Sequence, residues 1–351
     1  MLLRLHLNEN PWGPPGASVR RLREAASRAH LYPDLETDQV EGALGSYLGL
    51  PAAQVMLTTG VDEATDLCLL EFGRLRVVTP GFAGFTDRAR ALGFPYQSYP
   101  LDGWNGLPAS LLADVDQADL VMLASPNNPT GMAFAEEEIR RLIERGCHVL
   151  LDQTYVDFAG GASVEARYWL DACERVLLFR SFSKGFGLGG LRIGALLGNP
   201  HLIGRLRSRR AYASVDRLAV EAVLGVLEEE PDFPIQLASR IAVQRRALIR
   251  VLRSSGLFES VLDSVASFVL TICASEAATR KLRDQLRDEA GVLVALGAAF
   301  GVDCGLRFSV PDDAGLTRVE DALRAIRDGQ RRIDDDELAR RSPQPECQPL
   351  R

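Results

Sequence analysis

The sequence of 351 residues is very poor in lysine, because only Lys184 and Lys281 are lysines among its 40 basic residues. Arginine keeps its proton in proteins and cannot act as an amine nucleophile. A chain that is rich in arginine, alanine, leucine and glycine is the usual product of a GC-rich coding bias, so the scarcity needs no functional cause. A lysine in a position that favours chemistry still stands out, and Lys184 is such a lysine.

Clusters of cysteine and histidine and long apolar runs are also absent. The six cysteines and four histidines are scattered, without a Cys-x-x-Cys pair. This spacing excludes the common zinc motifs and a disulfide framework, so we expect no metal site. No apolar run is long enough to span a membrane, and the polar segment Asn8-Glu9-Asn10-Pro11 lies where a secretory signal would be apolar. We therefore expect a protein of the reducing cytoplasm without a membrane partner.

Positive charge is in deficit, since 47 acidic residues outnumber 40 basic ones and the net charge is -7. Domains that bind nucleic acid usually carry a net positive charge, so we expect no nucleic-acid partner. Hydrophobic residues make up 46% of the chain and charged residues 25%. A chain of this length and composition can bury two hydrophobic cores.

Short apolar runs alternate with helix-compatible stretches from about residue 54 onward, which is typical of βα units in a mostly parallel sheet. Several of the runs are apolar throughout, which predicts burial on both faces. The predicted fold is α/β, with a large domain built on a sheet of about seven strands. These strands are expected at 55–58, 76–78, 96–99, 120–124, 148–151, 176–180 and 193–197.

The strand pattern stops after Asn199-Pro200, and the next three segments predict helices at 202–210, 217–229 and 235–254. A second, smaller α/β region follows. Its strands are expected at 267–273, 292–296 and 305–310, and its helices at 277–289 and 316–328. We predict a large domain at 30–225, a small domain formed by 1–29 with 226–330, and a disordered tail at 331–351.

The strand at 176–180 leads into a loop of small residues that contains Lys184 and Arg192. Ligands of α/β sheets bind beyond the carboxyl ends of the strands, where this loop lies. A dinucleotide-binding fingerprint fits poorly, because the spacing is G-x-G-x-G-G and no acidic ribose ligand follows; a plain flexible loop is the other interpretation. A partly desolvated lysine among small residues can form a Schiff base with an aldehyde. Pyridoxal phosphate is the aldehyde that this pattern favours.

Pyridoxal phosphate also needs an acid for its ring nitrogen, donors for its ring hydroxyl, a phosphate cradle and an aromatic neighbour. Asp152 ends an apolar strand and is the candidate acid, and Tyr155 and Asn128 are candidate donors to the ring 3'-oxygen. Phe82, after the strand at 76–78, is the candidate stacking aromatic. Each has an ordinary alternative role, as a turn cap, an Asn-Pro turn or a core aromatic.

The candidate phosphate cradle is the segment 58–63, where a strand turns into a helix and presents free N–H groups to an anion. The hydroxyls of Ser181 and Ser183 and the guanidinium of Arg192 would complete it. A phosphate dianion favours such charge-assisted donors. These two segments together predict a phosphate site.

The motifs taken together resemble the class I/II aminotransferases of PLP fold type I, and within them the histidinol-phosphate aminotransferase branch. The resemblance covers residues 7 to about 328, and its motifs stand in the family's order and at its spacing. They are Asn8-Glu9-Asn10-Pro11-Trp12-Gly13, Ser125-Pro126-Asn127-Asn128-Pro129-Thr130-Gly131 and Ser181-x-Ser183-Lys184-x-Phe186-x-Leu188-x-Gly190-Leu191-Arg192-x-Gly194.

The resemblance implies that Lys184 forms the Schiff base with pyridoxal phosphate and that Arg307 binds the substrate α-carboxylate. It implies a homodimer with a shared active site, in which Tyr32 reaches the neighbouring subunit's phosphate. It also implies a cis peptide bond at Asn128-Pro129. The other implied cofactor contacts are Asp152 at the pyridine nitrogen, Tyr155 and Asn128 at the 3'-oxygen, Phe82 on the ring, and Ser181, Ser183, Arg192 and the amides of Val61 and Asp62 at the phosphate.

Two departures from the family pattern bear on the substrate. The family commonly reads Asp-Glu-Ala-Tyr where this chain has Asp152-Gln153-Thr154-Tyr155, which keeps both cofactor contacts and changes their surroundings. Histidinol-phosphate aminotransferases carry a second arginine shortly before the carboxylate arginine, and here the apolar run Val292-Leu293-Val294-Ala295-Leu296 occupies that stretch. We expect this run to form an apolar wall of the substrate site, unless Arg4 or Arg20 replaces the missing arginine.

The sequence therefore predicts a PLP-dependent aminotransferase of amino-acid metabolism. It would move an amino group between an amino acid or amino alcohol and a 2-oxo acid, with an unphosphorylated side chain. The alternatives are histidinol-phosphate aminotransferase proper and a PLP-dependent decarboxylase, cyclase or replacement enzyme, because these chemistries share fold and cofactor contacts. A PLP-binding sensor without turnover would be expected to carry a DNA-binding domain, for which the residues before Leu7 leave no room. A cofactor-free α/β protein is the last alternative.

Overall fold

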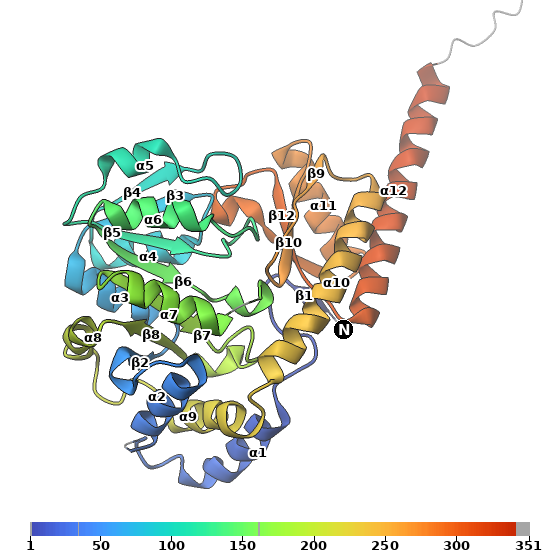
Figure 1. Cartoon of the computed structure of the whole chain (residues 1–351). Coiled ribbons are helices and arrows are strands. Elements are labelled where there is room, and N and C mark those ends of the chain that lie inside the picture. The colour runs from blue at the N-terminus through green and yellow to red at the C-terminus, as the bar shows by residue number, and fades with distance from the viewer. Residues whose placement is uncertain (1, 34, 161, 342–351) are drawn as a thin grey trace, which may run out of the picture.

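The computed structural model describes residues 2–33, 35–160 and 162–341 and contains two sheets with helices around them (Figure 1). The larger sheet has seven strands in the order β2-β8-β7-β6-β5-β3-β4. Only β8 runs antiparallel to its neighbours, so the predicted mostly parallel seven-stranded sheet is confirmed. The strands are β2 (Val55–Thr58), β3 (Leu75–Thr79), β4 (Tyr96–Pro100), β5 (Leu120–Ala124), β6 (His148–Asp152), β7 (Val176–Ser181) and β8 (Gly194–Gly198).

Both faces of this sheet are covered, so its central strands are buried throughout and consist mainly of apolar residues. Alternate residues of a strand point to opposite faces, and β5 shows this directly. Val121 and Leu123 belong to one hydrophobic core, and Leu120 and Met122 belong to another on the opposite face. The first core includes α2 (Leu35–Leu48), α5 (Ala109–Asp114), α6 (Glu136–Glu144), α7 (Ala162–Ala172) and α9 (Arg217–Leu224), and the second includes α3 (Val61–Phe72), α4 (Ala83–Leu92) and α8 (Pro200–Arg207).

The smaller sheet has five strands in the order β1-β11-β12-β10-β9. Its strands are β1 (Leu3–Leu5), β9 (Ser260–Val261), β10 (Phe268–Ile272), β11 (Val292–Leu296) and β12 (Gly305–Ser309). The helices α10 (Phe233–Ser255), α11 (Glu276–Asp288) and α12 (Asp313–Arg341) pack with this sheet around a separate core. Strands β1 and β9 are not predicted by the sequence pattern, because two or three residues are too few to produce a period-two pattern.

The last helix differs from the expectation of a helix at 316–328 followed by a disordered tail. Helix α12 continues to Arg341 and projects beyond the small domain in Figure 1. The helix is therefore longer than the sequence pattern predicts, and the expected disorder of the tail remains a prediction. The rest of the predicted tail, 342–351, lies outside the described residues.

The N-terminal segment connects the two halves of the molecule. Strand β1 joins the small sheet beside β11, whereas α1 (Gly16–Ala25) packs against α9 and the π-helix at Gly225–Glu229. The Ser18 hydroxyl donates to the Ala222 carbonyl over 2.7 Å, and the Ala17 N–H donates to Glu230 over 2.7 Å. Residues 6–15 therefore cross from the small sheet to the large domain, and the predicted domain limits remain a prediction.

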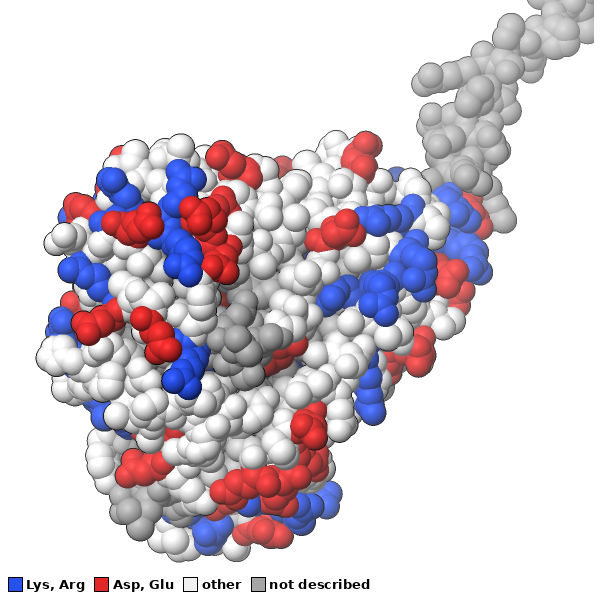
Figure 2. Space-filling view, in the orientation of Figure 1, with Lys and Arg blue, Asp and Glu red and all other residues white. Residues whose placement is uncertain are grey.

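A cis peptide bond, the lengths of the helices and the distribution of surface charge each relate to a prediction from the sequence. The peptide bond between Asn128 and Pro129 is cis, as the resemblance implies. None of the described helices is both long and apolar enough to cross a membrane. Basic and acidic side chains are interspersed over the face seen in Figure 2.

Candidate active site

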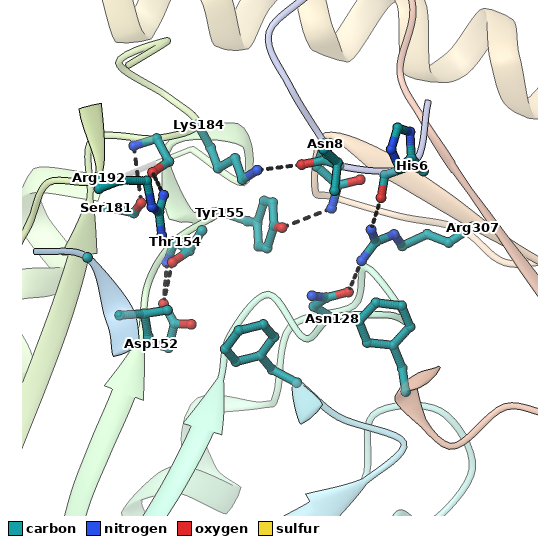
Figure 3. Close-up of a pocket in the computed structure, with 16 residues that line it drawn as sticks. His6, Asn8, Asn128, Asp152, Thr154, Tyr155, Ser181, Lys184, Arg192 and Arg307 are labelled. Carbon is teal, nitrogen blue, oxygen red and sulfur yellow. Dashed lines mark hydrogen bonds between the residues drawn. The ribbon is translucent and has the colours of Figure 1, made fainter. Parts of the chain in front are cut away.

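A cavity of about 280 Å³ lies between the two sheets, at the carboxyl ends of β6 and β7. Crossovers of a parallel sheet place loops at these strand ends, which is where α/β proteins bind ligands. In Figure 3, Lys184 and Arg307 approach the cavity from opposite sides, with Tyr155 between them. The lining residues are His6, Leu7, Asn8, Gly60, Val61, Phe82, Asn128, Asp152, Thr154, Tyr155, Ser181, Ser183, Lys184, Arg192, Phe300 and Arg307.

Lys184 follows β7, and its Nζ donates a hydrogen bond to the Leu7 carbonyl oxygen over 2.6 Å. Burial lowers the pKa of this amine to about 8, and the positive charges of Arg307 and Arg192 act in the same direction. Desolvation disfavours the ammonium form, so a substantial fraction of the amine is neutral near pH 8. A neutral amine can act as a nucleophile or accept a proton.

Asp152 is the last residue of β6 and is buried, with 5% of its surface exposed. Its Oδ1 accepts hydrogen bonds from the Thr154 amide over 2.9 Å and the Thr154 hydroxyl over 2.5 Å. Burial raises the pKa of Asp152 to about 6, although the two bonds from Thr154 oppose this shift. None of the ion pairs among the described residues involves Asp152. A buried carboxylate without a cation suits the protonated nitrogen of a pyridine ring.

Arg307 lies in the middle of β12 and is buried, with only 4% of its surface exposed. Nη1 donates to the Asn128 side-chain oxygen over 2.5 Å, and Nη2 donates to the His6 carbonyl over 2.7 Å. The guanidinium carbon lies 4.6 Å from the Phe300 ring centroid and 5.2 Å from that of Phe268.

No carboxylate pairs with Arg307 among the described residues, and its Nε has no hydrogen-bond partner there. Burial lowers the pKa of this guanidinium from its ordinary value. A buried guanidinium held by neutral groups is costly and retains free donors. It is therefore suited to a carboxylate that arrives with a ligand.

The opposite end of the cavity is built to bind an anion. Gly60 precedes α3 with a φ of 83° and no side chain caps this helix, so the first amides, including that of Val61, have no partner within the helix. Arg192 Nη1 lies 3.5 Å from the Ser183 hydroxyl, and a Cβ on Gly60 would lie 3.2 Å from Arg192 Nη2. The Ser181 hydroxyl lines the same cavity. Two hydroxyls, a guanidinium and a helix N-terminus fit a phosphate dianion.

The structure brings most of the predicted site residues together and leaves two outside. The side chain of Asp62 does not line the cavity, although the residue lies in the first turn of α3. Tyr32 is 72% exposed and packs edge-on against Tyr212, with ring centroids 6.1 Å apart. The cavity lining takes in the rest: Lys184, Asp152, Tyr155, Val61, Phe82, Asn128, Ser181, Ser183, Arg192 and Arg307.

The expectation that 292–296 forms an apolar wall of the site is wrong. Strand β11 lies between β1 and β12, where Val292 and Val294 belong to the small-domain core, and no residue of β11 lines the cavity. Neither alternative anchor lines it either, because Arg4 pairs with Glu9 and Arg20 pairs with Glu229. A continuous apolar run cannot distinguish a core strand from a pocket wall, since both are buried.

Sequence reasoning gave no role to His6, Leu7, Asn8, Thr154 or Phe300, and all five line the cavity. The only sequence signal for the N-terminal lining residues is the run Asn8-Glu9-Asn10-Pro11, which forms part of the family resemblance. Phe300 is in the 3₁₀ turn at Gly297–Phe300, and nothing in the sequence marks it. Its place depends on how the small domain packs on the large one.

Comparison with known proteins identifies the family of the chain. The family model described as aminotransferase class I and II matches residues 1–323. A histidinol-phosphate aminotransferase of Symbiobacterium thermophilum is 32% identical over 333 residues, which are 92% of this chain and 90% of that protein. One of Granulibacter bethesdensis is 30% identical over 338 residues, covering 93% and 89%. The chain belongs to the class I and II aminotransferase family.

Solved structures share the fold. A histidinol-phosphate aminotransferase of Sinorhizobium meliloti in complex with pyridoxal-5'-phosphate superposes with a TM-score of 0.85 at 25% identity, covering 93% of this chain and 91% of the other. An L-threonine-O-3-phosphate decarboxylase of Porphyromonas gingivalis has a TM-score of 0.80 at 21% identity, covering 93% and 99%. The protein therefore has PLP fold type I, which serves more than one chemistry.

The family is PLP-dependent, and the residues of this chain fit that cofactor. Asp152 supplies the buried carboxylate, Lys184 the amine with a lowered pKa, and the α3 N-terminus with Arg192 the anion cradle. Phe82 lines the cavity beside them. The residues that line the cavity therefore have the chemical groups that this cofactor requires.

Proposed function

We propose that the protein is an aminotransferase that moves an amino group between an amino acid or amino alcohol and a 2-oxo acid with an unphosphorylated side chain. The observation that carries this proposal is Arg307, a buried guanidinium with neutral partners that approaches the cavity opposite Lys184. A 2-oxo acid and an amino acid share a carboxylate beside the reacting carbon. One arginine can therefore orient both substrates of the two half-reactions.

The predicted site residues would have separate roles in the reaction. Lys184 would act as the general base and acid that moves the proton at the substrate Cα, for which a pKa of about 8 is suited. Bound pyridoxal phosphate supplies the electron sink for the bond broken at Cα. Asp152 keeps the ring nitrogen protonated, and Tyr155 and Asn128 donate to the ring 3'-oxygen. Ser181, Ser183, Arg192 and the amides of Val61 and Asp62 hold the phosphate, and Phe82 covers the ring.

The preference for an unphosphorylated substrate is supported by the small number of positively charged side chains in the cavity lining. Its cationic lining residues are Lys184, Arg192 and Arg307, and each already has a role. The expected position of a second anchor is taken by β11, which lies in the core. A distal phosphate would lack a dedicated partner.

A second candidate is histidinol-phosphate aminotransferase, because the relatives of this chain at 30% and 32% identity carry that name. This candidate requires a cation that reaches the phosphate from outside the lining described here. A neighbouring subunit is one source, and we propose that the protein is a homodimer with a shared active site. The exposed Tyr32 and Tyr212 rings supply an aromatic surface for such a contact, from which Tyr32 would reach the partner's phosphate cradle.

A panel of amino donors tests the proposal. The PLP-loaded protein is mixed with single donors, including histidinol phosphate and histidinol, and the loss of visible absorption is followed in a single turnover. Comparable rates for histidinol and histidinol phosphate would support the proposal. A dedicated anchor would instead favour the phosphorylated donor by about 10-fold or more per charged hydrogen bond, which would select the second candidate. Release of CO2 without amino transfer would overturn both.

A further inference from the structure

The side chain of Asn8 is buried between the two domains, with 2% of its surface exposed, and it connects them through hydrogen bonds. Its amide Nδ2 donates to the Tyr155 hydroxyl over 2.9 Å. Its Oδ1 accepts from the Ser309 hydroxyl over 2.9 Å, and its backbone N–H donates to the same hydroxyl over 2.8 Å. Tyr155 follows β6 of the large sheet and Ser309 ends β12 of the small one.

The backbone of Asn8 explains why the side chain can reach both partners. Its φ is 54°, in the left-handed region that glycine, asparagine and aspartate tolerate best. Glycine would relieve this conformation but would offer no polar side chain. The position therefore combines an unusual backbone with an amide whose donor and acceptor are both used.

The direction of the bond to Tyr155 determines what that hydroxyl can do. A tyrosine hydroxyl has one proton and also accepts hydrogen bonds. Because Asn8 Nδ2 donates to it, the proton of Tyr155 is not consumed by Asn8 and is available to the cavity that Tyr155 lines. Burial raises the pKa of Tyr155, so the hydroxyl keeps its proton, while the charge of Arg307 has the opposite effect.

The residues next to Asn8 reinforce its place. The His6 carbonyl accepts from Arg307, and the Leu7 carbonyl accepts from Lys184. Ser309 lies two residues beyond Arg307 on β12, so its contact with Asn8 fixes the segment to the strand that carries the arginine. Asn8 is thus held from the small domain and acts on a residue of the large one.

We propose that Asn8 is a positioning residue that fixes the Tyr155 hydroxyl as a hydrogen-bond donor toward the ring oxygen of the cofactor. This inference rests on the cofactor site of the proposed function and is independent of which amino donor the enzyme uses. The Tyr155 bond to an anionic ring oxygen stabilises that oxygen. Without the hydrogen bond from Tyr155, the ring oxygen is a stronger base and holds more firmly the proton that it shares with the nitrogen linked to the cofactor. The pH at which the visible absorption of the PLP-loaded enzyme changes should therefore rise.

Asn8→Asp tests the direction of the bond. Aspartate has the same shape and tolerates the same φ, but its carboxylate can only accept, so the Tyr155 proton turns away from the cavity. We expect the PLP-loaded variant to shift the pH midpoint of its visible absorption upward by about one to two units, the equivalent of one charge-assisted hydrogen bond. Asn105→Asp, on the loop between β4 and α5, is the charge-matched control and should leave the midpoint unchanged.

A double-mutant cycle with Tyr155→Phe separates positioning from the effect of the new charge. If Asn8 acts through Tyr155, Asn8→Asp adds little further shift in the Tyr155→Phe background. A full additional shift there would overturn the proposal, because the charge would then act directly. An Asn8→Asp midpoint equal to that of the wild type would overturn it as well.

Asn8→Gly provides a second test in case the Asn8→Asp protein does not bind the cofactor. Glycine accepts the backbone conformation and removes the amide, so we expect a smaller upward shift together with a lower kcat. Wild-type midpoints in this variant would also overturn the proposal. A wild-type protein that binds no PLP would instead refute the cofactor site itself, and a PLP-binding protein without amino transfer would refute the proposed reaction while leaving the role of Asn8 intact.

Discussion

The Lys184 amine donates a hydrogen bond to the backbone carbonyl of Leu7, 2.6 Å away, across the boundary between the large domain and the N-terminal segment. A carbonyl is a neutral acceptor, so it orients the amine without stabilising its charge as a carboxylate would. Burial and two nearby guanidinium groups then lower the pKa of Lys184 to about 8. The N-terminal segment therefore lines the cavity as well as linking the two sheets.

Lys184 should be the residue that becomes linked to PLP. We expect the purified protein to be yellow, and borohydride reduction followed by peptide mapping should find the label on Lys184. The rate at which the apoprotein takes up PLP should rise with pH up to about 8 and then level off, since the neutral amine is the reactive form.

The other lysine provides the control for this experiment. Lys281 lies exposed on α11, so Lys281→Arg should keep the colour and the activity. Lys184→Ala should abolish turnover and leave the circular dichroism spectrum unchanged. A label on Lys281 alone would refute the assignment.

Thr154 should set the charge of Asp152. Its hydroxyl donates to the carboxylate, and hydrogen bonds to the charged form lower a carboxyl pKa. Thr154→Val removes this donor and should raise the pKa of Asp152 from about 6 by about one to two units. PLP binding weakens as the pH falls and Asp152 becomes protonated. In Thr154→Val this loss of binding should begin at a higher pH than in the wild type.

Thr154→Ser is the matched variant, because it keeps the hydroxyl and should behave like the wild type. Asp152→Asn should still bind PLP and lose most of kcat, since the ring nitrogen is no longer held protonated. A fully active Asp152→Asn protein would contradict this role. The two kinds of variant thus separate the charge of Asp152 from its presence.

Arg307 should control the binding of the carboxylate. Arg307→Lys keeps a charge but loses the planar pair of donors, so kcat/KM for a 2-oxo acid should fall by about 10-fold to 100-fold. Steady-state kinetics with an acid and the corresponding neutral aldehyde measure the effect, which should be confined to the acid. Equal losses on both compounds would indicate general damage.

Arg4→Gln is the companion variant for the substrate question. Arg4 lies in an exposed ion pair with Glu9 and does not line the cavity. We expect unchanged kinetics with every donor. A selective loss with histidinol phosphate would identify Arg4 as the missing phosphate anchor.

The buried pair of Arg180 and Asp157 should stabilise the fold beneath the Lys184 loop. Arg180 Nη2 lies 2.6 Å from Asp157 Oδ1, and the side chains are only 3% and 5% exposed. Asp157→Ala leaves a buried guanidinium without its carboxylate, so the free energy of unfolding should fall by about 3 to 5 kcal/mol.

Urea denaturation of the apoprotein measures this loss. Asp87→Ala, which breaks an exposed pair with Arg90, is the control and should leave stability nearly unchanged. A small effect of Asp157→Ala would mean that water or another group relieves the charge of Arg180.

The sequence by itself determined the large sheet and the cofactor end of the site. The strands β5, β7 and β8 consist mainly of apolar residues because both faces of the sheet are covered, and this pattern is local. Lys184, Ser181, Ser183 and Arg192 lie within the short segment 181–192, so their proximity also follows from the chain itself.

Only the tertiary structure decided the substrate end. The strand β1 is three residues long and owes its existence to pairing with β11, nearly three hundred residues away in the chain. This pairing brings Asn8 to Tyr155 and His6 to Arg307, while the packing of the two domains brings Phe300 over the same arginine. It also places β11 in the core, which the apolar sequence alone could not distinguish from a pocket wall. Contacts between distant segments leave no local periodicity, and for that reason they had to be seen in three dimensions.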